Sequence, residues 1–84
     1  MAELNVRYFA SARAAAGVGS ETIDVVDGMT VADVLHVLTE RHPGRLAAIA
    51  NASSLLLDGV VVRSPETRVA TASDLDILPP FAGG

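Results

Sequence analysis

The spacing of apolar residues along this 84-residue chain changes from a period of two to a helical period, and then back to a period of two. Leu4, Val6 and Tyr8 alternate with polar residues, which predicts a half-buried strand over about residues 3–9. Residues 30–41 instead repeat apolar residues at helical spacing after Thr30 and Asp33, which resemble a capping box, and this predicts the main helix. A chain of this length fills one hydrophobic core, so we expect these elements to pack together in a single domain.

Shorter elements surround this helix. Residues 9–16 are rich in helix formers and are followed by Gly17, which predicts a short helix with a left-handed cap. Residues 21–26 alternate again and predict a second strand. Residues 45–50 have the composition of one or two further helical turns.

A hairpin is predicted in the second half of the chain. Asp58 and Gly59 separate two apolar triplets, and this dipeptide suits a two-residue turn in which both residues have positive φ. Strands are therefore predicted at residues 55–57 and 60–62. Residues 64–73 are a polar connection from which Val69 is expected to enter the core.

The last strand is short and leads into an unusual ending. Leu75 and Ile77 alternate with Asp74 and Asp76, and the strand is predicted to stop at a proline, which has no backbone N–H. The chain then ends in Pro79-Pro80-Phe81-Ala82-Gly83-Gly84. These divisions predict a domain over residues 1–78 and an extended, flexible tail over residues 79–84.

Composition excludes several functions. The chain has no cysteine, so thiolate metal sites, disulfides and a thiol nucleophile are excluded. Its net charge of −4 disfavours nucleic acid and anionic lipid, so proteins are the expected partners. All six basic residues are arginines. The first residues lack a basic and then apolar signal segment, so the cytoplasm is the expected location.

The order of strand, strand, long helix and three strands fits a mixed sheet with a helix on one face. This α+β order is the β-grasp, or ubiquitin-like, pattern. Together with three motifs it resembles the MoaD/ThiS family of sulfur carriers, and within it the small subunit of molybdopterin synthase. The motifs are Arg7-Tyr8-Phe9, Leu57-Asp58-Gly59 and the ending from Leu78 to Gly84.

The chain departs from the family at two turns. Family members tend to have Asn-Gly where this chain has Asp58 and Gly59, and Gly-Asp where it has Ala72 and Ser73. Both departures lie outside the tail.

The resemblance implies a function for the C-terminal carboxylate of Gly84. An E1-like adenylyltransferase and sulfurtransferase would use ATP to adenylate it, and sulfur would then replace AMP to give a thiocarboxylate. The thiocarboxylate would supply sulfur for the dithiolene of molybdopterin during molybdenum cofactor biosynthesis. The carrier itself would bind no cofactor and need no catalytic side chains. The implied partner is the large subunit of molybdopterin synthase, in a heterotetramer.

The tail residues suit this function physically. Pro79 and Pro80 favour an extended exit, which reduces the entropy lost when a partner takes up the tail. Gly83 and Gly84 have no Cβ and can enter a narrow channel. Ala82 is also expected to lie in that channel. Phe81 is expected to anchor the tail in a partner's groove, or alternatively to fold back on its own domain.

A partner-binding apolar patch is predicted on the sheet near Phe9 and the hairpin.

Other polar residues have simpler explanations. Asp74 and Asp76 could form a patch that the activating enzyme reads, but charges on the open face of an edge strand more often aid solubility. His36 and His42 have no neighbouring metal ligands in the sequence, so structural roles and no metal site are expected.

Three alternative functions remain open from the sequence. The chain could carry sulfur for another pathway, such as thiamin or cysteine synthesis or tRNA thiolation. It could also be a ubiquitin-like modifier that is joined through Gly84 to target lysines. A plain interaction domain with an idle tail is a third possibility.

Overall fold

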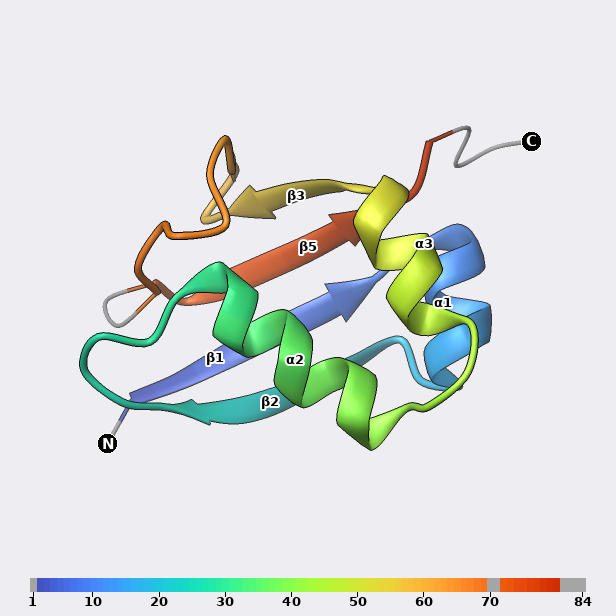
Figure 1. Ribbon diagram of the computed structural model, residues 1–84, viewed down its shortest axis with the longest axis horizontal. Coiled ribbons are helices and arrows are strands. Elements are labelled where there is room, and N and C mark those ends of the chain that lie inside the picture. Colours follow the sequence, from blue (N-terminus) through green and yellow to red (C-terminus); the bar gives the residue numbers. More distant parts are fainter. Residues whose placement is uncertain (1, 70–71, 81–84) are drawn as a thin grey trace.

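The computed structural model describes residues 2–69 and 72–80. These residues form one mixed five-stranded sheet with helices on one face (Figure 1). The strands are β1 (Ala2–Tyr8), β2 (Ser20–Val25), β3 (Ser54–Leu57), β4 (Val60–Val61) and β5 (Asp74–Leu78). The helices are α1 (Ala10–Ala16), α2 (Val31–Arg41) and α3 (Leu46–Ala52). The predicted β-grasp fold is confirmed, and α3 is longer than the sequence indicated.

The strand order in the sheet is β2-β1-β5-β3-β4. β5 pairs in parallel with β1 and antiparallel with β3, so the last strand lies in the middle of the sheet (Figure 1). The expectation that Asp74 and Asp76 lie on an edge strand is therefore wrong. Hydrophobic alternation identifies a strand but carries no information about its neighbours, because pairing partners are distant in the chain.

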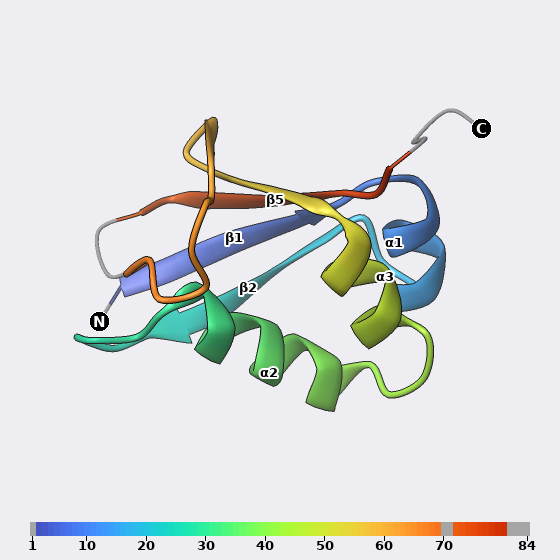
Figure 2. The same cartoon turned by 45° about the horizontal axis from the view of Figure 1, so that its top comes forward.

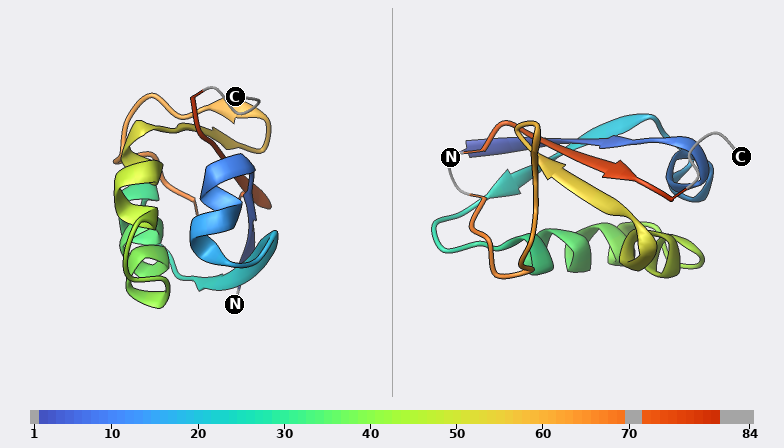
Figure 3. Two further views of the ribbon diagram at one scale, coloured as in Figure 1. Left: turned by 90° about the vertical axis from the view of Figure 1, so that its right-hand side faces the viewer. Right: turned by 90° about the horizontal axis from the view of Figure 1, so that it is seen from above.

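The core lies between the sheet and the helices. Inward-facing residues of the central strands meet the apolar side of α2, and the layered arrangement is clear when the sheet is seen edge-on (Figure 2; Figure 3, right). Val69 is fully buried, which confirms that the long connection contributes to the core. The fully buried large side chains are Leu4, Val6, Val31, Val34, Leu38, Leu46, Val69, Leu75 and Ile77.

Local signals define the element boundaries. Thr30 accepts a hydrogen bond from the backbone of Asp33, whose side chain accepts one from the backbone of Thr30, so the predicted capping box begins α2. Gly17 has φ +81° and ends α1 in the left-handed conformation, as predicted. Asp58 and Gly59 both have positive φ, which confirms the hairpin turn.

The side chain of Asp58 also fastens the hairpin to β5. Its Oδ1 accepts hydrogen bonds from the backbone N–H groups of Ser73 (2.9 Å) and Asp74 (2.8 Å). In turn, the backbone N–H of Asp58 donates to the carbonyl of Asp74 (2.9 Å). Both departures from the family pattern, at Asp58 and at Ser73, therefore take part in one contact.

Replacing Asp58 is expected to destabilise the domain. Asp58→Ala removes the acceptor of two backbone N–H groups. Alanine at φ +49° also lacks the local hydrogen bonds by which aspartate tolerates this conformation. We therefore expect the free energy of unfolding to fall by about 2 kcal/mol. Asp58→Gly relieves the backbone strain and should cost about half as much. Chemical denaturation would measure both changes. Asp27→Ala, in the other Asp-Gly turn, is the matched control. An equal loss of stability there would contradict a stabilising role for the hydrogen bonds that Asp58 accepts.

Candidate functional site: the tail root

The tail begins at the end of the central strand. β5 ends at Leu78, Pro79 is buried and Pro80 is exposed. The backbone N–H of Phe9 donates to the carbonyl of Ile77 (3.2 Å), so β1 holds this end of β5 from one side while β3 pairs with it on the other. The tail therefore starts from a position that is fixed on both sides.

The remaining predicted tail residues, Phe81, Ala82, Gly83 and Gly84, lie outside the described residues. Their predicted roles stay predictions. What the structure determines is the platform from which they extend, namely the tail root at Leu78, Pro79 and Pro80. Pro79 has no backbone N–H, which is consistent with the sheet ladder ending immediately before it.

Phe9 lies beside the tail root. It follows β1 with extended backbone angles and precedes α1, where its carbonyl accepts hydrogen bonds from Ala12 (3.0 Å) and Arg13 (3.4 Å). Its side chain is 39% exposed. Because Tyr8 pairs with Ile77 in the parallel register, Phe9 is level with Leu78 at the end of the sheet.

The uncovered face of the sheet carries an apolar stripe, formed by Phe9, Leu56, Val61 and Leu78. Strand alternation places these residues opposite the core-facing ones, and the pairing of Leu56 with Val61 joins β3 to β4. Val61 is 50% exposed and Leu56 and Leu78 are partly exposed. The stripe extends from the tail root to the outer edge of the sheet.

A charged pair interrupts this face. Arg7 of β1 donates two hydrogen bonds to Asp76 of β5, from Nε to Oδ1 and from Nη2 to Oδ2 (3.0 Å). The hydrogen bond and the charge of Asp76 raise the pKa of Arg7. Asp76 is only 8% exposed, so it is not the solvated charge that the sequence suggested. Its burial follows from its place in a central strand next to a bidentate arginine.

A groove opens beside the tail root, and sequence reasoning did not find it. Its volume is about 360 Å³. The lining residues are Ser11 of α1, Arg45 before α3, Ala48, Ile49 and Ala52 of α3, and Pro79 and Pro80. The view along the sheet toward its tail end shows α1 and α3 side by side there (Figure 3, left). We call this surface the tail-root groove.

A polar cluster joins α2 to the sheet. The Tyr8 hydroxyl donates to Glu21 Oε2, His42 Nε2 lies against the same oxygen, and Arg41 Nη1 donates to Glu21 Oε1 (2.9 Å). The rings of Tyr8 and His42 pack edge to face, with their centroids 6.0 Å apart. His42 thus has the structural role predicted for it. His36 is exposed, and its Nε2 lies 3.6 Å from Oε1 of Glu40.

The environment changes the pKa values of two members of this cluster. Burial acts to raise the pKa of Glu21, but hydrogen bonds from Tyr8, His42 and Arg41 outweigh burial and lower it below 4.5. Burial, followed by the hydrogen bond to Glu21, raises the pKa of Tyr8 well above its ordinary value. The Tyr8 hydroxyl therefore remains protonated and acts as a donor at neutral pH.

The stabilising effect of Glu21 is expected to depend on pH. Glu21→Gln should lower the free energy of unfolding by about 1–2 kcal/mol at pH 7, because the charged acceptor of three side chains is lost. The pKa of Glu21 is lowered by folding, so the contribution is present above the unfolded value of 4.5 and is lost as pH falls through the folded value. The difference between the two proteins should therefore shrink below about pH 4.5.

Denaturation of both proteins from pH 7 to pH 3 would measure this effect. Glu40→Gln, on the exposed side of α2, is the matched control and should change stability by less than about 0.5 kcal/mol. If the difference in free energy of unfolding between Glu21→Gln and the unchanged chain stays constant with pH, the charge of Glu21 does not stabilise the domain.

No group of three or more histidine, cysteine, aspartate or glutamate residues is placed to hold a metal ion within the described part of the chain. Likewise, none of its helices is long and apolar enough to span a membrane. The arrangement that remains is a domain whose central strand ends at the tail root, with an apolar stripe on one face and a groove beside the tail root. This arrangement defines a ubiquitin-like β-grasp domain.

Comparisons with known proteins agree with this class. The model of the ThiS family matches residues 6–84. A molybdopterin synthase sulfur carrier subunit from Chlamydomonas reinhardtii is 30% identical over 83 residues, which is 98% of this chain and 99% of that protein. The chain therefore belongs to the ThiS/MoaD family of ubiquitin-like sulfur carriers.

Solved structures share the fold over almost the whole chain. SAMP1 from Haloferax volcanii superposes with a TM-score of 0.83 at 23% identity, covering 99% of this chain and 100% of that one. The solution structure of small archaeal modifier protein 1 from Methanosarcina acetivorans has a TM-score of 0.79 at 30% identity, covering 100% of this chain and 98% of that one.

Proposed function

We propose that the chain is the sulfur-donating small subunit of a molybdopterin synthase, and that it carries sulfur as a thiocarboxylate on Gly84. The observation that carries this proposal is the sequence match to the algal molybdopterin synthase sulfur carrier subunit, which extends over 98% of the chain. The position of the tail root at the end of the central strand supports it. Its site of action is proposed to be the cytoplasm.

The proposed chemistry has two steps. The Gly84 carboxylate attacks the α-phosphorus of ATP on an E1-like partner enzyme, which releases pyrophosphate and leaves an acyl-adenylate. Hydrogen sulfide ion, supplied by that partner, then attacks the acyl carbon, AMP leaves, and loss of the sulfur-bound proton to water gives the thiocarboxylate. Adenylation is needed because a carboxylate oxygen is a poor leaving group, whereas AMP is a good one. ATP acts on the partner enzyme, and the carrier itself holds no cofactor.

The chain contributes position to this chemistry. A tail rooted between β1 and β3 keeps the reacting carboxylate within a short distance of a fixed point, which favours delivery into a partner's active site by proximity. The last two residues are glycines, so no side chain blocks the acyl carbon. The sulfur-transfer step onto the pterin precursor is then the task of the partner.

The proposed partner for that step is the synthase large subunit, in a heterotetramer with two carriers. The apolar stripe at Phe9, Leu56, Val61 and Leu78 offers a surface that it could bury. It is continuous with the tail root, so docking and tail insertion would occur on adjoining surfaces. Phe81 is proposed to anchor the tail in the large subunit.

A second candidate function is supported by one comparison. The modifier protein from Methanosarcina acetivorans is as similar to this chain, at 30% identity, as the algal carrier subunit is. In that case Gly84 would be joined to amines of target proteins. The chain has no lysine, so copies could not be joined to one another through lysine side chains. Sulfur donation to another pathway remains the alternative within the carrier class.

Incubating the chain with its activating enzyme, ATP and a sulfur donor, followed by denaturing electrophoresis and intact-mass analysis, separates these functions. A carrier should stay a single band whose mass rises by one oxygen-to-sulfur exchange. A modifier should instead form larger species, on addition of cell extract, that survive denaturant and thiol. Conjugates without any thiocarboxylate would overturn the proposed function.

A further inference from the structure

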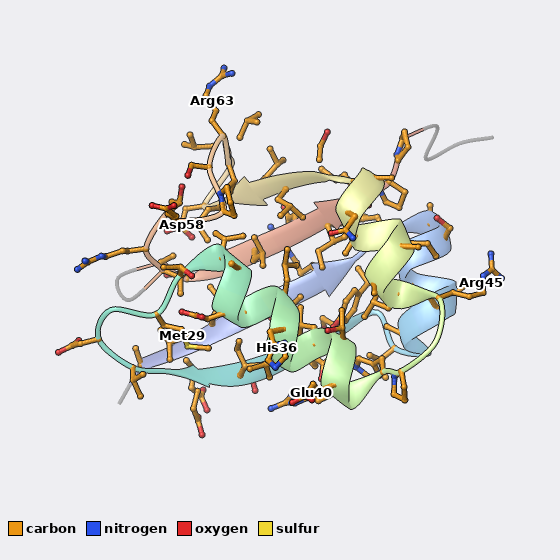
Figure 4. All side chains as sticks on the ribbon, in the orientation of Figure 1. Met29, His36, Glu40, Arg45, Asp58 and Arg63 are labelled. Atoms are coloured by element: carbon orange, nitrogen blue, oxygen red, sulfur yellow. The ribbon has the colours of Figure 1, made fainter. Side chains whose placement is uncertain are left out.

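The end of the molecule at the tail root differs in charge from the rest. Residues 9–19, 42–56 and 77–80 surround the root, and they contain Arg13 and Arg45 but no aspartate or glutamate. All ten acidic residues belong to other segments of a chain of net charge −4, and of these Glu21 contacts this set through His42. Arg45 projects from this end, whereas Asp58 and Arg63 lie toward the opposite end (Figure 4).

Arg45 is available for an outside partner. Arg7 and Arg41 are each paired with a carboxylate of the domain, but Arg45 is exposed and its guanidinium makes no hydrogen bond or ion pair with residues 2–69 or 72–80. It lies at the border of the tail-root groove. An exposed guanidinium beside a concave surface is well suited to a carboxylate.

The groove itself is largely apolar. Ala48 and Ala52 present small side chains, and Ile49 and the two prolines supply larger apolar surfaces. The small residues leave the concave space, because longer side chains at positions 48 and 52 would fill it. The groove thus combines an apolar floor with one cation at its border.

We propose that the tail-root groove receives an acidic side chain with an apolar neighbour, presented by the protein that takes up the tail. This inference rests on the proposed function and names the chemistry of its partner. The groove and the tail share Pro79 and Pro80. The four residues after Pro80 span at most about 14 Å when fully extended, so a protein that encloses Gly84 must place its surface close to this groove.

Charge explains why an acidic contact is favoured here. The chain has a net charge of −4 and therefore repels an acidic partner surface overall, whereas the exposed Arg13 and Arg45 lie at the tail-root end. An acidic group at the entrance of the partner's channel would therefore be attracted to Arg13 and Arg45 at this end. Such complementarity orients the tail toward the channel during the encounter.

Charge reversal at Arg45 tests the proposal. The affinity of the full-length chain for the synthase large subunit would be measured by calorimetry at low and high salt. Arg45→Glu is expected to weaken binding at least about tenfold at low salt and by less at high salt. Arg63→Glu makes the same change in net charge at an exposed site near the hairpin, and should stay within about twofold of the unchanged chain.

A second variant tests the groove without a change in charge. Ala48→Gln puts a longer side chain into the groove from an exposed helix position, and it should also weaken binding. The thermal unfolding of each variant would show that the fold is kept. A rim aspartate or glutamate of the large subunit changed to arginine should restore the affinity of Arg45→Glu.

The possible failures are distinguishable. If the unchanged chain does not bind the large subunit, the proposed function is wrong and this inference falls with it. If it binds and Arg45→Glu behaves like Arg63→Glu, only this inference is wrong. NMR spectra of the backbone amides would test two other occupants. Shifts of Ala48 and Ile49 on removal of residues 81–84 would show that the chain's own tail occupies the groove. Shifts of these amides that depend on protein concentration would indicate a second copy of the chain. Either would overturn the proposal.

Discussion

A chain that lacks Gly84 is expected to take up no sulfur from its activating enzyme, while its thermal stability stays unchanged. The adenylation and the exchange of AMP for sulfur both take place at the carboxylate of the final glycine in the proposed mechanism. Removal of Gly84 moves the carboxylate one residue, about 3.5 Å, closer to the tail root, which is enough to lose the aligned geometry of the reaction. The buried residues of the described structure end at Pro79, so the fold should not depend on Gly84.

Intact-mass analysis after incubation with enzyme, ATP and sulfur donor would measure the loss. Adding one alanine after Gly84 is the second variant, because it lengthens the tail and adds a Cβ beside the reacting carbon. Replacing Glu3, on the far side of the domain, by glutamine is the control and should leave loading intact. Full loading of the shortened chain would show that the position of the carboxylate does not matter, and would contradict the carrier mechanism.

Replacing Leu75 by alanine is expected to destabilise the domain strongly. Leu75 is fully buried on the central strand and faces the helices, next to Val6 and Leu57 of the neighbouring strands. The loss of its side chain leaves a cavity that a central strand cannot close, so the free energy of unfolding should fall by about 3 kcal/mol. For a domain of this size, that corresponds to a decrease in Tm of about 15 °C.

Leu56→Ala is the matched control because it removes the same atoms from the uncovered face of the adjacent strand. Leu56 is partly exposed, so its loss should cost about 1 kcal/mol or less. It should instead weaken binding to the large subunit through the apolar stripe. Chemical denaturation would compare the two variants, and equal losses of stability would contradict the assignment of the two faces.

Much of the fold could be predicted because the responsible interactions are local. The Asp58-Gly59 turn, the capping box at Thr30 and the cap at Gly17 each involve residues within a few positions of one another. Alternating and helical spacings of apolar residues likewise reflect the geometry of a single element. The end of β5 before Pro79 is local in the same way, because proline has no backbone N–H to continue the ladder.

Tertiary structure decided what depends on distant residues. Arg7 and Asp76 are 69 positions apart, and their pairing exists only because β5 enters the sheet between β1 and β3. The contact of His42 with Glu21 and the tail-root groove arise in the same way, from elements that become neighbours on folding. The sequence by itself determined the strands, the helices and their order along the chain, because these follow from local backbone and side-chain preferences. Only the packed structure determined that the last strand lies in the middle of the sheet and which surfaces surround its end, because pairing partners are chosen by burial of the whole core.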